Sequence, residues 1–218
     1  MTLTLYAIPM STYCAKVRII LRLKSIDHLE IPPPGGTYKT DAYRAIVAAG
    51  SIPAIQSGAF VLHDSDAISE YLEDNYPDPA MRPENPQVRA RLRSIARYHD
   101  TRLEPALRTL FGFIGRAKSS DKTKTALATL EDCLERLENL IDPSPYLWGD
   151  RLSLADCAYP TTLFMIQDVS AALQRTIELP DKVMAWRKAL YNNVTISQIV
   201  DENRDAVSSW LISITESA

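Results

Sequence analysis

The stretch Ser51-Ile52-Pro53-Ala54-Ile55 decides the fold, together with the turn Gln56-Ser57-Gly58 and the second apolar run Phe60-Val61-Leu62. Two short apolar runs separated by a turn predict two adjacent strands. Because a proline has no N–H to give to a strand ladder, Pro53 is expected at an edge, at a bulge or after a cis bond. In each case the N–H and C=O of Ile52 are expected to be free to pair with a backbone outside the sheet.

The residues after these two runs predict the start of a helix. Asp64 and Ser65 offer side-chain oxygens of the kind found at helix N-termini. The unpaired N–H groups and the dipole of a helix start favour an anion. A free strand edge next to such a start predicts a receptor for an extended peptide with a carboxylate, although a purely structural role stays open. The apolar stripe of the predicted helix consists of Ala67, Ile68, Tyr71 and Leu72.

The composition limits the class of protein and of partner. The 218 residues suffice for one large domain or two small ones, each with its own core. A net charge of −3, from 24 Lys and Arg against 27 Asp and Glu, argues against a nucleic-acid partner. No apolar stretch has the length of a membrane span, and no secretory signal is predicted. Three cysteines without metal-ligand spacing suit reduced thiols, so we expect a cytoplasmic protein without a bound metal.

Residues 1–76 predict the element order β-α-β-α-β-β-α. Alternation of polar and apolar residues favours strands, and a spacing of three or four residues favours helices. Ser11 or Thr12 is the expected N-cap of the first helix. The run of prolines and glycines over 32–36 predicts an extended loop. Before the two strands described above, the predicted elements are a strand over 2–8, a helix over 13–24, a strand over 28–31 and a helix over 41–48.

A second, helical part follows a proline-rich linker. The linker is predicted over 77–86, between a domain of residues 1–76 and a domain of residues 87–218. Ser153-Leu154-Ala155-Asp156 is a capping box, predicted to open a buried helix that runs through Leu173 and to contribute to stability rather than chemistry. The other predicted helices cover 87–110, 125–141, 181–191 and 196–212.

These motifs, in this order, resemble those of the soluble, cytosolic glutathione S-transferases. Ser11-Thr12-Tyr13-Cys14-Ala15-Lys16-Val17-Arg18 resembles the serine-type active-site turn, and Ser51-Ile52-Pro53-Ala54-Ile55 resembles the cis-proline strand. Asp64-Ser65-Asp66-Ala67-Ile68 resembles the glutathione motif, and Leu152 to Asp156 with Pro160 resembles the capping box of the helical domain. The resemblance covers nearly the whole chain. It implies a thioredoxin-like α/β domain with a mixed four-stranded sheet, an all-α domain that contributes the second-substrate pocket, and a homodimer.

The resemblance also implies glutathione as a co-substrate. Its backbone would pair with Ile52, and its γ-glutamyl group would lie at Asp64 and Ser65. Its thiol would lie at Ser11. A thiol with a pKa near 8.5 is only about 3% thiolate at pH 7, and lowering that pKa to about 6.5 requires about 2.7 kcal/mol. A hydroxyl that donates to the sulfur at a helix N-terminus stabilises the thiolate, so Ser11 is predicted to be a hydrogen-bond donor and not a base.

Each neighbouring candidate has a plainer interpretation beside the functional one. Ser11 could be an N-cap alone, and Thr12 is the alternative donor to the sulfur. Cys14 is predicted to be a bystander that faces the first helical turn, with a redox nucleophile as the alternative. Lys39 is predicted to pair with the glycine carboxylate of glutathione, or else to be a solvated loop residue.

The second substrate is harder to assign. Tyr13, together with Tyr98 and Arg102 on the helix that forms the pocket wall in relatives, is predicted to line its pocket. The alternative for Tyr98 and Arg102 is a solvated helix face. The arginines between 89 and 108 are interpreted in the same way, as a solvated face.

Three functions of different classes remain open. The leading prediction is a detoxifying transferase, in which the glutathione thiolate attacks a small hydrophobic electrophile by conjugation or by ether or halide cleavage. The first alternative is glutathione-dependent cis–trans isomerisation of the maleylacetoacetate or maleylpyruvate type. Zeta-type isomerases have Ser-Ser-Cys-Ser where this chain has Ser11-Thr12-Tyr13-Cys14, which weakens that alternative. The second alternative is a binding module, against which the combination of Ser11, Pro53 and Ser65 argues.

Overall fold

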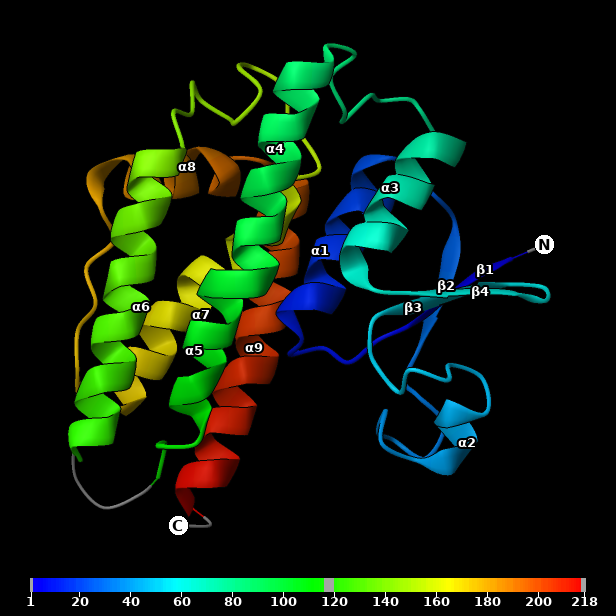
Figure 1. Ribbon diagram of the computed structural model, residues 1–218. Helices are drawn as coiled ribbons and strands as arrows, with labels where there is room; N and C mark the ends of the chain where they lie inside the picture. The colour runs from blue at the N-terminus through cyan, green and yellow to red at the C-terminus, as the bar shows by residue number, and fades with distance from the viewer. Residues whose placement is uncertain (1, 116–119, 217–218) are drawn as a thin grey trace.

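Figure 1 shows a computed structural model of the chain, in which residues 2–115 and 120–216 are described. The molecule has two parts, a sheet flanked by helices and a group of helices beside it (Figure 1). The elements of the first part are β1 (Leu3–Tyr6), α1 (Thr12–Leu23), β2 (His28–Ile31), α2 (Asp41–Arg44), β3 (Ala54–Ser57), β4 (Phe60–His63) and α3 (Ser65–Asn75).

The four strands form one mixed sheet in the order β2-β1-β3-β4. β1 and β2 run parallel, whereas β3 runs antiparallel to both β1 and β4. This arrangement, with helices on the sheet, confirms the predicted thioredoxin-like domain. The β3–β4 pair is the hairpin that the two apolar runs and the glycine turn predict.

Side chains alternate between the two faces of this sheet. Leu5 on β1 pairs with Ile55 on β3, and both are fully buried in the core that includes α1 and α3. The next residue, Tyr6, lies in a smaller core with Tyr43 of α2, where the two ring centroids are 5.6 Å apart. The period of two along β1 therefore places α1 and α3 on one face and α2 on the other.

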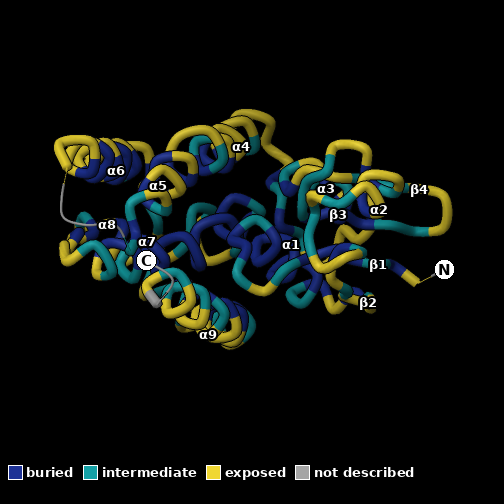
Figure 2. Tube along the Cα trace, turned by 90° about the horizontal axis from the view of Figure 1, so that it is seen from below, coloured by how far each residue is buried: buried dark blue, intermediate teal, exposed yellow. Residues whose placement is uncertain are grey.

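The second part is helical. α7 is apolar and buried nearly all round, as predicted, and Figure 2 shows buried residues along α1 and α7. In the ranges 2–115 and 120–216, no helix has the length and apolar character needed to cross a membrane. The α-helices are α4 (Pro86–Tyr98), α5 (Glu104–Phe111), α6 (Asp121–Leu140), α7 (Pro160–Ala172), α8 (Asp181–Tyr191) and α9 (Val194–Glu216).

Several helices differ from the prediction. α2 ends at Arg44 instead of residue 48, α6 begins at Asp121 instead of residue 125, and α9 ends at Glu216 instead of residue 212. The single helix predicted over 87–110 is divided into α4 and α5 by a π-helical turn, His99–Leu103. Pro105 follows this turn and has no N–H to donate to the carbonyl four residues earlier, so the regular α pattern cannot continue through it. The capping box opens only a short 3-10 turn, and α7 begins later, at Pro160. Proline is favoured at a first helical position because the missing N–H would have no partner there.

Asp156 of the capping box joins three segments of the helical part. It is fully buried, and its Oδ2 accepts hydrogen bonds from the Ser153 hydroxyl at 2.6 Å and the Ser153 N–H at 2.8 Å. Its Oδ1 accepts from the Leu147 N–H at 3.1 Å and from Nε1 of Trp186, on α8, at 2.8 Å. Burial raises the pKa of Asp156 above its ordinary value, and these four hydrogen bonds act against that rise.

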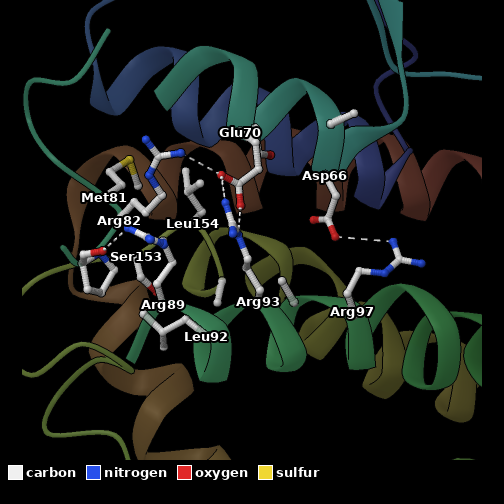
Figure 3. A pocket seen from close by; sticks show the side chains of 15 residues that line it. Asp66, Glu70, Met81, Arg82, Arg89, Leu92, Arg93, Arg97, Ser153 and Leu154 are labelled. Atoms are coloured by element: carbon white, nitrogen blue, oxygen red, sulfur yellow. Dashed lines mark hydrogen bonds and ion pairs between the residues drawn. The ribbon is translucent and has the colours of Figure 1, made fainter. Parts of the chain in front are cut away.

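Ion pairs connect α3 to the helical part. Figure 3 shows Glu70 pointing toward Arg82 and Arg93, with 2.6 Å between the Arg93 Nε and a Glu70 oxygen. One turn earlier, Asp66 faces Arg97 of α4 at 3.4 Å. A cavity of about 260 Å³ lies between these two helices. The boundary at residues 77–86 stays a prediction; the segment between α3 and α4 contains no helix or strand.

Candidate functional site

Ser11 lies where the loop after β1 enters α1. It is the N-cap of that helix, with φ −77° and ψ 120°, and its Oγ accepts a hydrogen bond from the Cys14 N–H at 3.3 Å. A hydroxyl that accepts in this way still has its own proton to donate. Ser11 is 7% exposed and borders a cavity of about 490 Å³. Its side chain is therefore placed to donate to a group in that cavity.

The cavity lies between the two parts of the molecule. Its size falls within the range typical of small-molecule sites, and its walls are mostly apolar. Tyr13 and Ile52 border it together with Ser11, so the turn and the proline strand meet there as predicted. The helical part contributes Arg108 and Phe111 from α5, Met165 from α7 and Trp210 from α9.

Ile52 presents a free backbone to this cavity. The Ile52–Pro53 peptide bond is cis, as the resemblance to the cis-proline strand implies. The ladder of β3 begins only at Ala54, which pairs with Tyr6 and His63. Within the described ranges, no residue hydrogen-bonds the N–H or C=O of Ile52. These two groups can pair with an extended backbone in the cavity.

At the start of α3, one residue caps the helix and the next residue has unpaired hydrogen-bond donors. Asp64 is the N-cap, and its Oδ1 accepts from the N–H groups of Asp66 at 3.0 Å and Ala67 at 3.1 Å. Its φ of +77° is rare for a residue with a side chain, and such conformations cost about 1–3 kcal/mol and cluster at ligand sites. Ser65 is 5% exposed, and no described residue bonds its N–H or its hydroxyl. Ser65 therefore keeps two donors for an anion.

Thr12 and Lys39 are not among the residues that line the cavity, and neither are Asp64 and Ser65. The Thr12 side chain is fully buried, because its hydroxyl donates to an oxygen of Glu104 at 2.6 Å. Its hydroxyl is thus engaged by Glu104. Lys39 is exposed on the loop before α2 and is outside the cavity lining, although its neighbour Tyr38 belongs to it.

Tyr98 and Arg102, which were expected at the second-substrate pocket, are also outside the lining of this cavity. The Tyr98 hydroxyl donates to the carbonyl of Cys133 on α6 at 2.9 Å, so its ring faces the neighbouring helix. Arg102 is exposed in the π-helical turn. The extra residue of the π-helical turn rotates the side chains that follow it around the helix axis. Arg108, which follows the turn, borders the cavity.

Arg108 was not expected at the site, because the arginines of this segment were interpreted as a solvated face. Its side chain is 41% exposed, and its Nη2 lies 3.0 Å from an oxygen of Glu104. Its guanidinium carbon lies 4.9 Å from the centre of the Tyr13 ring and 5.8 Å from that of Phe111. The spacing of four residues between Glu104 and Arg108 is the sequence signal that favours this ion pair.

Behind Arg108 lies a buried polar cluster. Glu104 is fully buried and also accepts from the Thr162 hydroxyl at 2.8 Å, and that hydroxyl is 2.8 Å from Nε2 of His99. Nδ1 of His99 lies 2.7 Å from Asp100, which also faces the buried Lys16. Burial acts to raise the pKa of Asp100, but His99 and Lys16 together hold it below its ordinary value. Glu104 is thus fixed on several sides and orients Arg108.

Two side chains of the turn are kept protonated by their surroundings. Burial, reinforced by the charge of Glu104, raises the pKa of Tyr13 to about 12. Cys14 is fully buried, and burial raises the pKa of its thiol. At neutral pH Tyr13 is therefore a hydrogen-bond donor and Cys14 is an unreactive thiol.

Comparisons with known proteins agree on one family. The family model for the glutathione S-transferase N-terminal domain matches residues 5–80, and that for the C-terminal domain matches residues 85–189. The chain is 31% identical to maleylacetoacetate isomerase of Pseudomonas aeruginosa over 85% of this chain and 94% of that one. It is 29% identical to mouse glutathione S-transferase theta-3 over 86% and 81% of the two chains. Among solved structures, a theta class glutathione S-transferase from Xanthomonas axonopodis pv. citri with glutathione bound has a TM-score of 0.75 and 25% identity, covering 91% of this chain and 97% of that one.

Proposed function

The chain belongs to the glutathione S-transferase family, and on that basis we propose that it binds glutathione beside Ser11 and stabilises the glutathione thiolate for reaction with a small electrophile. The observation that supports this most is the meeting of the Ser11 hydroxyl and the free Ile52 backbone at one cavity. A hydroxyl at a helix start and an unpaired strand edge suit a thiol on an extended peptide.

The proposed position of glutathione follows from the donors and acceptors that are free. Its backbone pairs with the N–H and C=O of Ile52. Its γ-glutamyl carboxylate accepts from the N–H and hydroxyl of Ser65, and the uncapped oxygen of Asp64 faces its ammonium. Lys39, on the adjoining loop, is the candidate partner for the glycine carboxylate. Thr12 has no part in this proposal, because its hydroxyl donates to Glu104.

The proposed chemistry begins with loss of the thiol proton to solvent. Ser11 donates its hydroxyl hydrogen to the sulfur, and the dipole of α1 favours the negative charge, so the thiolate becomes the main form at neutral pH. The sulfur electron pair then forms a bond to the electrophilic carbon, and the leaving group departs with its electron pair. Phe111, Met165 and Trp210 provide an apolar wall for the electrophile.

Arg108 favours a second candidate function, the isomerisation of an unsaturated acid. A guanidinium offers a planar pair of donors that suits a carboxylate, and this one is half-exposed in the cavity and oriented by Glu104. The thiolate would add to the cis double bond, the resulting single bond would rotate, and the sulfur would leave with the trans bond re-formed. Glutathione is regenerated, so its amount stays constant. The likeness to a protein named maleylacetoacetate isomerase supports the same candidate.

A substrate panel separates the two candidates. Calorimetry first measures glutathione binding, and the absence of binding would refute both. The enzyme is then given glutathione with a neutral aryl halide, an aryl ether or a maleyl diketo acid. A transferase consumes glutathione with the first two, whereas an isomerase converts the acid without consuming it. Arg108→Met should slow turnover of the acid about tenfold or more and should leave the neutral substrates within about threefold, because only the acid has a charge for Arg108.

The homodimer and the cytoplasmic location stay proposals that rest on the family. Light scattering on the purified chain measures its mass, and a mass of a single chain at micromolar concentration would contradict the dimer.

A further inference from the structure

The loop that carries Ser11 is held from behind by a side chain of the last helix. Asn203, on α9, is 1% exposed, and its Nδ2 donates to the carbonyl oxygen of Pro9 at 2.7 Å. The two residues are 194 positions apart in the sequence, and Pro9 lies two residues before Ser11. The C-terminal part of the chain therefore reaches directly to the backbone of the proposed thiol loop.

A second anchor holds the same loop from the N-terminal part. Nη2 of Arg18 donates to the Ile8 carbonyl at 3.1 Å, and Nη1 donates to the Pro9 carbonyl at 3.3 Å. Arg18 is itself held by Glu30, at the end of β2, with 2.8 and 2.9 Å between its Nε and the two carboxylate oxygens. The Ser11 N–H donates back to the Ile8 carbonyl at 3.3 Å. The Ile8 carbonyl thus accepts from the Ser11 N–H and from Arg18, and the Pro9 carbonyl accepts from Arg18 and from Asn203.

The asparagine at position 203 makes its bond to the loop while its other polar side-chain atom stays without a described partner. Its Oδ1 is buried and has no hydrogen-bond partner among the residues that the structure describes. Leaving a buried acceptor unpaired costs more than one neutral hydrogen bond contributes, whereas an apolar side chain of the same shape leaves nothing unpaired. The one side-chain hydrogen bond that Asn203 makes to a described residue ends at the loop of Ser11.

We propose that Asn203 is a positioning residue for Ser11. By fixing the Pro9 carbonyl, it sets the direction in which the Ser11 hydroxyl points toward the glutathione sulfur, and so it lowers the pKa of the bound thiol. The inference rests on the proposed role of Ser11. α9 also supplies Trp210 to the cavity wall, where its ring packs against Phe111 with 4.9 Å between centroids. The helix that borders the second substrate therefore also orients the thiol donor.

The test is the pKa of the bound glutathione thiol, measured as thiolate absorbance against pH. Asn203→Leu removes the bond to Pro9 and also the unpaired oxygen, so its melting temperature should stay close to that of the parent enzyme. The bound thiol pKa should rise, and kcat at pH 7 should fall about threefold to tenfold, because each pKa unit changes the thiolate ratio tenfold. The glutathione Kd should stay within about twofold. Asn203→Ala, which also lacks the donor, gives the same measurement where the leucine variant does not fold.

The neighbouring residue provides the matched control. Glu202 pairs with Arg22 at 2.7 Å and so also joins α9 to α1, but it does not contact the loop. Glu202→Gln should leave the thiol pKa unchanged. If the thiol pKa is unchanged in both Asn203 variants, the positioning role is wrong. It is also wrong if Glu202→Gln raises the thiol pKa equally, because the general docking of α9 would then explain the rise. Failure of the proposed function would look different, since Ser11→Ala would then leave the thiol pKa unchanged as well.

Discussion

The starts of α1 and α3 supply groups proposed to bind glutathione. They differ in whether the residue that caps the helix is also the one that contacts the ligand. At α1 the cap is Ser11, in an ordinary extended conformation with φ −77°, and the same hydroxyl is the proposed donor to the sulfur. At α3 the cap is Asp64, with a φ of +77°, and the proposed anion donors belong to the next residue, Ser65. At α1 one side chain both caps the helix and is the proposed donor to the ligand. At α3 these two roles belong to two residues.

The difference determines what a substitution can separate. A change at Ser11 alters the cap and the proposed chemistry together, whereas changes at Ser65 and Asp64 address ligand binding and helix stability separately. A third start, at Ser153 and Asp156, lies outside the Ser11 cavity and serves as a reference for stability alone. The three starts should therefore respond in three distinct ways.

The largest effect on stability is expected at the third start. Asp156→Ala removes the acceptor of four hydrogen bonds and leaves the Trp186 Nε1 and the Ser153 hydroxyl among the unpaired donors. We expect a loss of about 3–4 kcal/mol, more than the roughly 0.5–2 kcal/mol of a simple cap, and a fall in melting temperature of about 6–16 °C. Thermal unfolding measures this change, with the exposed Asp150→Ala as control. The pH–rate profile should keep its shape; a shifted profile with unchanged melting would contradict the structural role.

Ser11→Ala should have the largest effect on chemistry. Without the hydroxyl, the pKa of the bound thiol should rise toward 8.5. If it starts near 6.5, the thiolate at pH 7 falls from about three quarters to about 3%, and turnover falls about 25-fold. The melting temperature should also fall, because a cap contributes about 1 kcal/mol.

Ser120 provides the matched control for the cap. It is the N-cap of α6 and accepts from the Thr123 N–H at 3.3 Å, the same distance as at Ser11, but it lies outside the cavity. Ser120→Ala should cost similar stability and leave turnover unchanged. Equal losses of turnover in both variants would show that the cap of α1, and not its hydroxyl at the sulfur, accounts for the effect.

A smaller effect, on glutathione binding and not on stability, is expected at the start of α3. Ser65→Ala removes one donor to the proposed γ-glutamyl carboxylate and should weaken glutathione binding by about 1–3 kcal/mol, the range for hydrogen bonds to charged groups. Melting should hardly change, because Asp64 still caps the helix. Calorimetry measures the Kd, with Ser94→Ala as control, because Ser94 is an exposed serine of α4 whose hydroxyl donates to the Arg91 carbonyl of the same helix. An unchanged Kd would refute the anion site.

Local signals predicted the parts of the fold and site that depend on neighbours in the sequence. Pro53 and the turn at Gly58 indicated the strand pair, and β2 and α8 begin and end at the predicted residues. The meeting of Ser11 with Ile52 was expected from the resemblance to the glutathione S-transferases, and both residues border the same cavity. A proline without an N–H or a glycine in a turn determines the backbone of the residues next to it in the sequence, so its effect can be predicted from the sequence.

The rest depends on contacts between distant segments. Pro105 lies inside an otherwise regular helical pattern, and the π turn before it changes which face of the segment meets the cavity. Tyr98 and Arg102, which were expected at the second-substrate pocket, are outside the cavity lining, and Arg108, which was interpreted as solvated, borders it. Trp210 reaches the cavity only through the packing of the last helix, which no spacing in the sequence reveals.

The smallest effect is expected for Cys14→Ala, and it tests whether the α1 start acts through a hydroxyl or through a thiol. A redox mechanism with a mixed disulfide at Cys14 requires an exposed cysteine of low pKa. Cys14 is fully buried, and burial raises the pKa of its thiol, so the thiolate is scarce at neutral pH. The variant should lose only packing, and turnover should stay within about twofold because the Ser11 hydroxyl is retained.

Thiolate absorbance of bound glutathione against pH decides between the two residues of this turn. In Cys14→Ala the thiol pKa should match that of the parent enzyme, and in Ser11→Ala it should rise. Cys133→Ala, a buried cysteine of α6, controls for loss of packing. Mass spectrometry of the parent enzyme with oxidised glutathione should show no mixed disulfide at Cys14. If the pKa of the bound thiol rose in Cys14→Ala and stayed low in Ser11→Ala, the Cys14 thiol would have the role proposed for Ser11. The starts of α1 and α3 would then no longer differ, because at both of them one residue would cap the helix and another would contact glutathione.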